Sequence, residues 1–145
     1  MAVVVQEKDF NLATELKKLA GCEGTAGAVI SFIGLVRGDE TLLALELEHY
    51  PAMTTKALEE IEQMARTKWG LVDVRIVHRF GRLQLGEQIM MVSVSASHRH
   101  SAFEAADYIM DFLKSRAPFW KKEHSISNNK WVTPNPDDEE ALNRW

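Results

Sequence analysis

The sequence is poor in the residues that mark disulfide-stapled, fibrous or membrane-embedded proteins. Among 145 residues it has one cysteine, Cys22, with four prolines and eight glycines. A lone cysteine excludes an intrachain disulfide and a cysteine-based metal site, and Cys22 in its Gly-flanked turn is most simply incidental. The longest apolar runs, such as 27–36, are far shorter than the ~20 residues that span a bilayer. Residues 1–10 lack the charged-then-apolar pattern of a secretion signal. We therefore expect a cytoplasmic protein that does not enter a membrane.

An excess of positive charge is also missing. Seventeen Lys and Arg against 21 Asp and Glu give a net charge of -4, whereas domains that neutralise nucleic-acid phosphates are usually basic. What is present is an ordinary globular composition, with 46% hydrophobic and 26% charged residues. A chain of this length buries roughly 70% of the surface exposed when unfolded. We expect one domain over 1–145, with an N-terminal helix region at 1–25 and a short C-terminal helix at 135–145.

The spacing of apolar residues indicates an α+β fold. A period near 3.6 predicts helices over 9–21, 54–69 and 101–116. Alternating or continuous apolar runs predict strands over 27–36, 41–50, 72–76 and 89–96, with a further short strand between two glycine breaks near 81–86. Strands in runs between helices favour a mixed, mainly antiparallel sheet with flanking helices.

Capping signals set the expected ends of these helices. The first helix has Asp9 or Asn11 as its N-cap and ends at Gly21. In the last long helix, Ser101 and Glu104 match a capping box. That helix presents an apolar face that consists of Phe103, Ala106, Ile109, Met110 and Leu113, and Pro118 forces it to end near Arg116.

A cationic segment, KSRAPFWKK at 114–122, stands out because it holds four cations and no acid. Lys114 follows Met110 by four residues, so its stem should be partly buried at the edge of the apolar face. An ammonium held where water is scarce attracts anions strongly and has a lowered pKa. Beyond Pro118 the chain can return and bring Lys121 and Lys122 near Lys114. The alternative is that these lysines are solvated around a hydrophobic staple.

Two other places hold candidate anion-binding residues. His98 and Arg99 lie between a predicted strand and a predicted helix N-terminus, where unpaired N–H groups favour phosphate or carboxylate. Arg37 follows the first long strand. A solvated turn is about as consistent with His98 and Arg99, and a loop arginine such as Arg37 is usually just solvated. No third ligand accompanies His98 and His100, so we expect no metal site and no cofactor.

Several segments together resemble the large, catalytic subunit of molybdopterin synthase. They are GAVISFIGLVR, LELEHYPAMTTKALEEI, VHRFGRLQLGE, HRHSAFEAADYIMDFLKSRAPFWKKE and the terminal NRW. The resemblance runs from about Gly27 to Trp145. It implies an α/β hammerhead-type single domain.

The resemblance also implies an activity. The family is a sulfurtransferase that converts cyclic pyranopterin monophosphate to molybdopterin, for molybdenum cofactor biosynthesis. Its sulfur arrives as a thiocarboxylate on the C-terminal Gly-Gly of a small ubiquitin-like sulfur-carrier subunit. The implied assembly is a heterotetramer around a large-subunit homodimer, and hydrolysis of an acyl intermediate releases the spent partner.

Residue roles are carried over from the same resemblance. Lys114 and Lys121 match the catalytic lysines. The substrate-binding positions match Leu35, Val36, Arg37, His98, Arg99, Lys114, Lys121, Lys122 and Glu123, with the segments around Arg37 and Lys121 lining one pocket. His98 and Arg99 are expected to reach the pocket of the other subunit in the dimer.

Two functions of other classes compete with this interpretation. A non-catalytic module could capture a partner's C-terminal tail in a cationic pocket, and it predicts binding without turnover. A single-stranded RNA binder could stack bases on Phe119 and Trp120 among the lysines. The acidic remainder of the chain disfavours the second.

Overall fold

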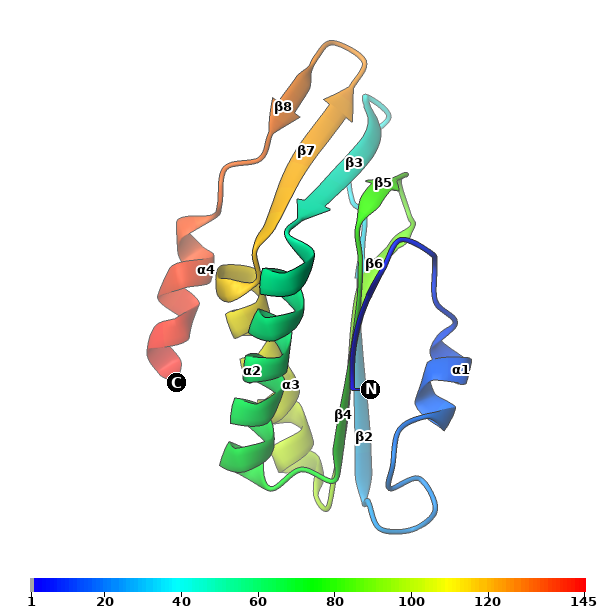
Figure 1. The fold of residues 1–145 in the computed structure, drawn as a ribbon, viewed down its shortest axis with the longest axis vertical. Helices are drawn as coiled ribbons and strands as arrows, with labels where there is room; N and C mark the ends of the chain where they lie inside the picture. The colour runs from blue at the N-terminus through cyan, green and yellow to red at the C-terminus, as the bar shows by residue number, and fades with distance from the viewer. Residues whose placement is uncertain (1) are drawn as a thin grey trace.

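The structure, a computed structural model, describes residues 2–145 and places its strands in two four-stranded sheets (Figure 1). The lower sheet has the order β1 (Val3–Gln6), β4 (Asp73–Arg79), β6 (Gln88–Ala96) and β2 (Ala28–Leu35). The upper sheet has the order β5 (Gly81–Leu83), β3 (Leu42–His49), β7 (Phe119–Ser125) and β8 (Asn129–Trp131). Strands β1 and β4 pair in parallel, and the other pairs are antiparallel. The α+β class and the mainly antiparallel pairing are confirmed, although the strands form two sheets.

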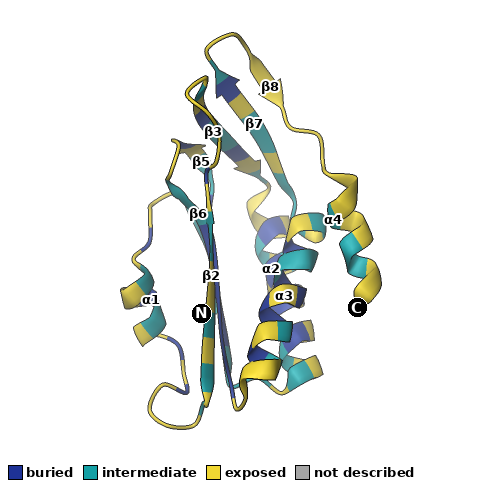
Figure 2. Ribbon diagram, turned by 180° about the vertical axis from the view of Figure 1, so that it is seen from behind, coloured by how far each residue is buried: buried dark blue, intermediate teal, exposed yellow. Residues whose placement is uncertain are grey.

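Helices cover both faces of the lower sheet. Helices α2 (Pro51–Trp69) and α3 (Arg99–Arg116) lie on one face and α1 (Leu12–Lys17) on the other, while α4 (Pro136–Ala141) packs beside α3 (Figure 1). A 3₁₀ turn, Leu142–Arg144, follows α4. The core between α2, α3 and the sheet includes Leu58, Ile61, Ala65, Ile76, Val92, Val94, Ala105 and Ile109. Because both faces are covered, β4 and β6 are buried almost throughout (Figure 2).

Helix α2 shows how local sequence fixes an element. Pro51 occupies its first turn, where a missing N–H costs nothing, so the helix starts three residues earlier than its apolar spacing indicates. Gly70 ends it at φ 59°, and its N–H donates to the Arg66 carbonyl. A side chain is disfavoured in this left-handed conformation, so glycine is the residue that suits the position.

The start of α3 corrects two predictions. The helix begins at Arg99, with His98 as an N-cap that makes no side-chain capping bond, so the Ser101–Glu104 capping box does not form. Glu104 instead accepts a hydrogen bond from Trp69 Nε1 at 3.0 Å and pairs with His100 at 2.9 Å. Phe103 is 60% exposed rather than part of the buried face. The end of the helix at Arg116, before Pro118, is confirmed.

The remaining differences concern short elements. Helix α1 has six residues and is capped by Asn11, whose side chain accepts from the Thr14 N–H at 3.0 Å, and it ends at Lys17, well before Gly21. Strands β1, β7 and β8 were not predicted. Strand β7 is the returning chain after Pro118, and its pairing with β3 places Lys121 opposite Leu47. That pairing joins the cationic segment to the upper sheet.

Candidate functional site

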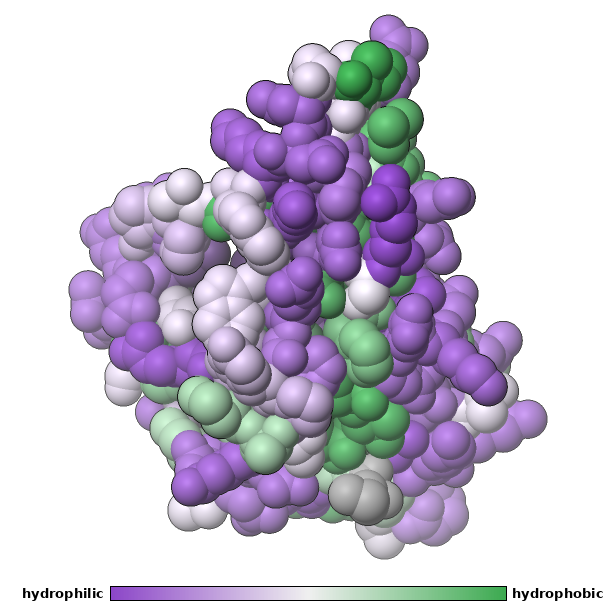
Figure 3. All heavy atoms as spheres, turned by 45° about the horizontal axis from the view of Figure 1, so that its top comes forward, coloured by the Kyte–Doolittle hydropathy of each residue, from purple (hydrophilic) through white to green (hydrophobic). Residues whose placement is uncertain are grey.

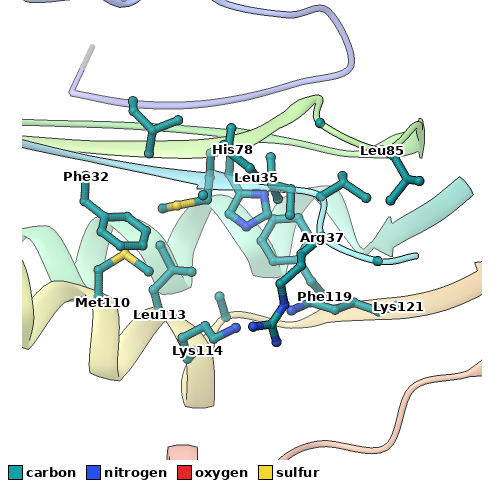
Figure 4. A pocket seen from close by; sticks show the side chains of 18 residues that line it. Phe32, Leu35, Arg37, His78, Leu85, Met110, Leu113, Lys114, Phe119 and Lys121 are labelled. Carbon is teal, nitrogen blue, oxygen red and sulfur yellow. The ribbon is translucent and has the colours of Figure 1, made fainter. Parts of the chain in front are cut away.

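A pocket of about 800 Å³ opens where the lower sheet, the upper sheet and the end of α3 meet. This volume lies within the usual range for small-molecule sites. Its apolar walls come from β2, β6 and α3 and include Phe32, Leu35, Met90, Met110 and Leu113. Figure 4 shows Phe32, Leu35, Met110 and Leu113 around a space that polar groups enter from the loop after β2, from α3 and from β7.

Three cations from three separate elements converge on this pocket. Arg37 follows β2, Lys114 lies in the last turn of α3, and Lys121 lies on β7, and Figure 4 shows their charged ends pointing toward one another. Among the described residues that line the pocket there is no Asp or Glu. At an effective dielectric constant near 20, an anion about 4 Å from one such cation gains about 4 kcal/mol before desolvation. The arrangement therefore suits an anionic group.

The fold lowers the proton affinity of Lys121. Burial, followed by repulsion from the Lys114 ammonium and a hydrogen bond with it, lowers the pKa of Lys121 to about 8, while Asp138 acts in the opposite direction. Lys121 is half-buried, whereas Lys114 is exposed although it lines the pocket. Of the two lysines, Lys121 is therefore the more buried. Near neutral pH, a fraction of Lys121 is a neutral amine able to accept a proton.

An aromatic wall stands behind the cations. The His78 and Phe119 rings stack with centroids 3.8 Å apart at 15°, and both line the pocket. His78 Nδ1 lies 2.8 Å from the Arg79 carbonyl oxygen. Since that oxygen only accepts, Nδ1 carries the hydrogen. Burial, with repulsion from Lys121, His49 and Lys114, lowers the pKa of His78 to about 4 against the effect of this hydrogen bond, so the ring is neutral at neutral pH.

Sequence reasoning missed His78, although a signal for it exists. Val74, Ile76 and His78 share one face of β4 by the two-residue period, and the first two belong to the main core. A polar residue that continues a buried apolar face is the informative kind of exception. The predicted strand ended at Ile76, so His78 fell outside it.

Of the predicted site residues, Leu35, Val36, Arg37, Lys114 and Lys121 line the pocket. Lys122 lies on the opposite face of β7, with its ammonium 5.4 Å from the Trp131 ring centre, and Glu123 is exposed. Neither lines the pocket, so the expected contribution of the KKE segment is limited to Lys121. Trp120 turns away with Lys122 and meets Tyr50 edge-on at 5.0 Å, leaving Phe119 as the aromatic wall.

His98 and Arg99 lie at the far end of α3 and are exposed. Arg99 precedes Lys114 by fifteen residues, which corresponds to roughly 22 Å along a helix. The fold of one chain therefore does not bring these two residues to the pocket.

Within residues 2–145, no three His, Cys, Asp or Glu side chains gather as metal ligands. No helix in the same range is long and apolar enough to cross a bilayer. Cys22 is exposed and free. Figure 3 shows a mostly hydrophilic face, with apolar side chains at the tip of the upper sheet and in a narrow column below.

The structure is a two-sheet α+β domain whose carboxylate-free, cation-lined pocket suits an anionic group. The sequence model of the family described as "MoaE protein" matches residues 5–116. The chain is 47% identical over 146 residues to the molybdopterin synthase catalytic subunit of Cereibacter sphaeroides, covering 100% of both. The chain therefore belongs to the MoaE family of molybdopterin synthase catalytic subunits and is an enzyme of molybdopterin biosynthesis.

Solved structures agree with this assignment. The "Molybdopterin biosynthesis MoaE protein" from Burkholderia ambifaria is 46% identical with a TM-score of 0.86, covering 100% of this chain and 98% of that one. A "protein-protein complex of subunit 1 and 2 of Molybdopterin-converting factor" from Helicobacter pylori gives a TM-score of 0.79 at 18% identity, covering 92% and 91%. The second likeness concerns the fold alone.

Proposed function

We propose that this chain converts cyclic pyranopterin monophosphate to molybdopterin, with sulfur from the C-terminal thiocarboxylate of a small ubiquitin-like partner. The observation that carries the proposal is the convergence of Arg37, Lys114 and Lys121 in a pocket without a lining carboxylate. Both proposed ligands are anions: the partner's tail ends in a thiocarboxylate and the substrate carries a phosphate. Charge-assisted hydrogen bonds to such groups are about twice as strong as neutral ones.

Each lysine has a distinct part in the proposed reaction. Lys114 is exposed at the pocket mouth and is suited to hold the incoming thiocarboxylate, and later the oxyanion that forms when water adds to the acyl carbon. Lys121, with its lowered pKa, can take or give a proton near neutral pH. Arg37 presents a planar guanidinium suited to bidentate contact with phosphate. Leu35 and Val36 shape the wall beside it.

We further propose that the enzyme is a heterotetramer around a dimer of this chain. His98 and Arg99 are too far from Lys114 to serve their own pocket, so a second copy must present them if they bind substrate. The edge strand β2 supports this, because its side chains Val29, Phe32 and Leu35 are 39%, 42% and 55% exposed. Apolar exposure on an edge strand is typical of an interaction surface. Lys122 and Glu123 are proposed as peripheral contacts to substrate.

A cytoplasmic location is part of the proposal. The free thiol of Cys22 and the two thiols of the product both suit a reducing compartment.

The test is a reconstituted assay with a thiocarboxylated small partner and cyclic pyranopterin monophosphate, in which dithiolene product is followed by fluorescence after oxidation. Lys114→Ala should abolish product while the folded dimer is kept. Lys130→Ala is the matched control, since Lys130 lies exposed on β8, does not line the pocket and should retain full activity. Tight binding of an authenticated partner without any product would instead favour a tail-capture module.

A further inference from the structure

His78 differs in kind from the other polar side chains of the pocket. Arg37, Lys114 and Lys121 are donors when charged, whereas a neutral imidazole carries one acceptor nitrogen. Among the described lining residues, His78 is the one neutral nitrogen base in the pocket at neutral pH apart from the unprotonated fraction of Lys121. A water molecule can donate one of its O–H groups to such an acceptor, so a site that positions water in this way needs one.

The surroundings of the ring fix which nitrogen is the acceptor. Nδ1 donates to the Arg79 carbonyl oxygen at 2.8 Å, so the lone pair lies on Nε2. His78 Nε2 makes no hydrogen bond. Because every fully buried side-chain nitrogen and oxygen in residues 2–145 has a hydrogen-bond partner, Nε2 is not fully buried. Nε2 therefore keeps access to the pocket space. Stacking on Phe119 at 3.8 Å holds the ring plane in place.

Given the proposed function, we propose that His78 is a catalytic residue whose Nε2 positions and deprotonates the water that hydrolyses the acyl–sulfur intermediate. After the thiocarboxylate sulfur has bonded to the pterin side chain, the partner's terminal carbonyl carbon is held in a thioester. Water adds to that carbon as one of its protons passes to Nε2. Lys114 and Lys121 stabilise the oxyanion.

The second half of the step returns the catalyst to its starting state. The carbon–sulfur bond to the partner breaks, the departing thiolate takes the proton from Nε2, and the partner leaves as a carboxylate after losing a proton to solvent. No oxidant or reductant is needed, because hydrolysis changes no oxidation state. The water, the thioester and the protons account for every atom.

Occupancy of the pocket tunes the base. The charges near the ring are Lys121 and Lys114, with His49 as the other titratable neighbour and Arg37 across the pocket. Repulsion by the two lysines helps to lower the pKa of His78, so an anion bound between them raises that pKa toward its usual range. The ring is therefore a stronger proton acceptor as the oxyanion forms between the two lysines than in the empty pocket.

Two substitutions of His78 test the role of the acceptor nitrogen separately from that of the hydrogen bond to Arg79. His78→Asn keeps a short amide that can donate to the Arg79 carbonyl but has no acceptor at the position of Nε2. His78→Gln extends an amide toward that position. His49→Asn is the control, because His49 contacts Phe119 at 5.7 Å and bonds Thr54 but does not line the pocket.

The experiment mixes each variant with thiocarboxylated partner and cyclic pyranopterin monophosphate and follows the covalent partner–pterin adduct by intact mass. His78→Asn should form the adduct at nearly the wild-type rate and hydrolyse it about 100-fold more slowly, the usual scale of general base catalysis. His78→Gln should recover part of that loss, and His49→Asn should behave as wild type. Hydrolysis by His78→Asn at the wild-type rate would overturn the role of His78 while leaving the proposed function intact. Wild-type protein that forms neither adduct nor product would overturn the proposed function itself.

A measurement on the wild-type protein covers the case in which His78→Asn does not fold. Adduct hydrolysis should slow as pH falls through a single ionisation between about 4 and 6.5, the range between the buried and ordinary pKa of His78. A hydrolysis rate that is constant from pH 4 to pH 8 would contradict the proposal.

Discussion

Replacing Lys121 by methionine should stabilise the protein while ending its activity. The fold lowers the pKa of Lys121 from 10.5 to about 8, mainly through burial and then through Lys114. Each pH unit corresponds to 1.36 kcal/mol, so the charged lysine destabilises the folded state by up to about 3 kcal/mol. Methionine keeps the length of the side chain and has no charge to desolvate. Lys121→Met should therefore unfold at higher urea concentration at pH 7.

The stability difference between Lys121→Met and the wild type should depend on pH. Below pH 8 the lysine is charged in both states, but the unfolded chain binds the proton more tightly, so the full cost is present. Between pH 8 and 10.5 the folded state releases its proton first, and the stability of the wild type rises. The advantage of Lys121→Met should shrink over that interval and vanish above it.

Urea unfolding at a series of pH values from 7 to 10.5 tests this reasoning, with equal m-values as the check that both proteins unfold alike. Lys122→Met is the control, because Lys122 lies on the other face of β7 over Trp131 and should show no such gain. A Lys121→Met protein that is no more stable at pH 7, or whose advantage is the same at pH 10, would refute the account of Lys121.

Arg37→Ala should raise the KM for the pterin about tenfold through loss of a charge-assisted hydrogen bond, with an unchanged circular dichroism spectrum; an unchanged KM at low salt would show that Arg37 does not hold substrate. In the wild type, stability should decline by up to about 3 kcal/mol as pH falls from 6.5 to 4, because the unfolded His78 takes up its proton first, and His78→Phe should remove that decline. Equal declines in both proteins would place the titration elsewhere. Leu58→Ala, at a fully buried position, should cost 2–5 kcal/mol in urea unfolding, and a cost below 1 kcal/mol would mean that the core there collapses around the cavity.

The long elements of the fold could be predicted from sequence because their apolar spacing is a local property. This spacing predicts helices α2 and α3 and strands β2, β3 and β6. Gly70 and Pro118 predict where the two helices end. Strands β1, β7 and β8 could not be predicted, because only pairing with distant partners makes strands of them. The capping box at Ser101 failed for the same reason, since Glu104 is engaged by Trp69.

Some features of the candidate site could likewise be predicted from the sequence, and others could not. Lys114, Lys121 and Arg37 could be named as candidates from their charge and position. That Arg37 shares a pocket with Lys121 was expected only from the family resemblance, and all three residues do line one pocket. The sequence could not indicate which of the two lysines is the more buried, because burial of Lys121 depends on where β7 joins the upper sheet. His78 was missed because its significance arises from stacking on Phe119, a residue 41 positions away in the sequence.

The central claim is that sulfur passes from a partner's thiocarboxylate to the pterin in the pocket formed by Arg37, Lys114 and Lys121. The most direct test supplies partner whose thiocarboxylate carries ³⁴S, with unlabelled cyclic pyranopterin monophosphate, and weighs the oxidised product by mass spectrometry. The account predicts a product with two ³⁴S atoms and two spent partner carboxylates for each product molecule. A product with unlabelled sulfur, or no product although the labelled tail is bound, would contradict it.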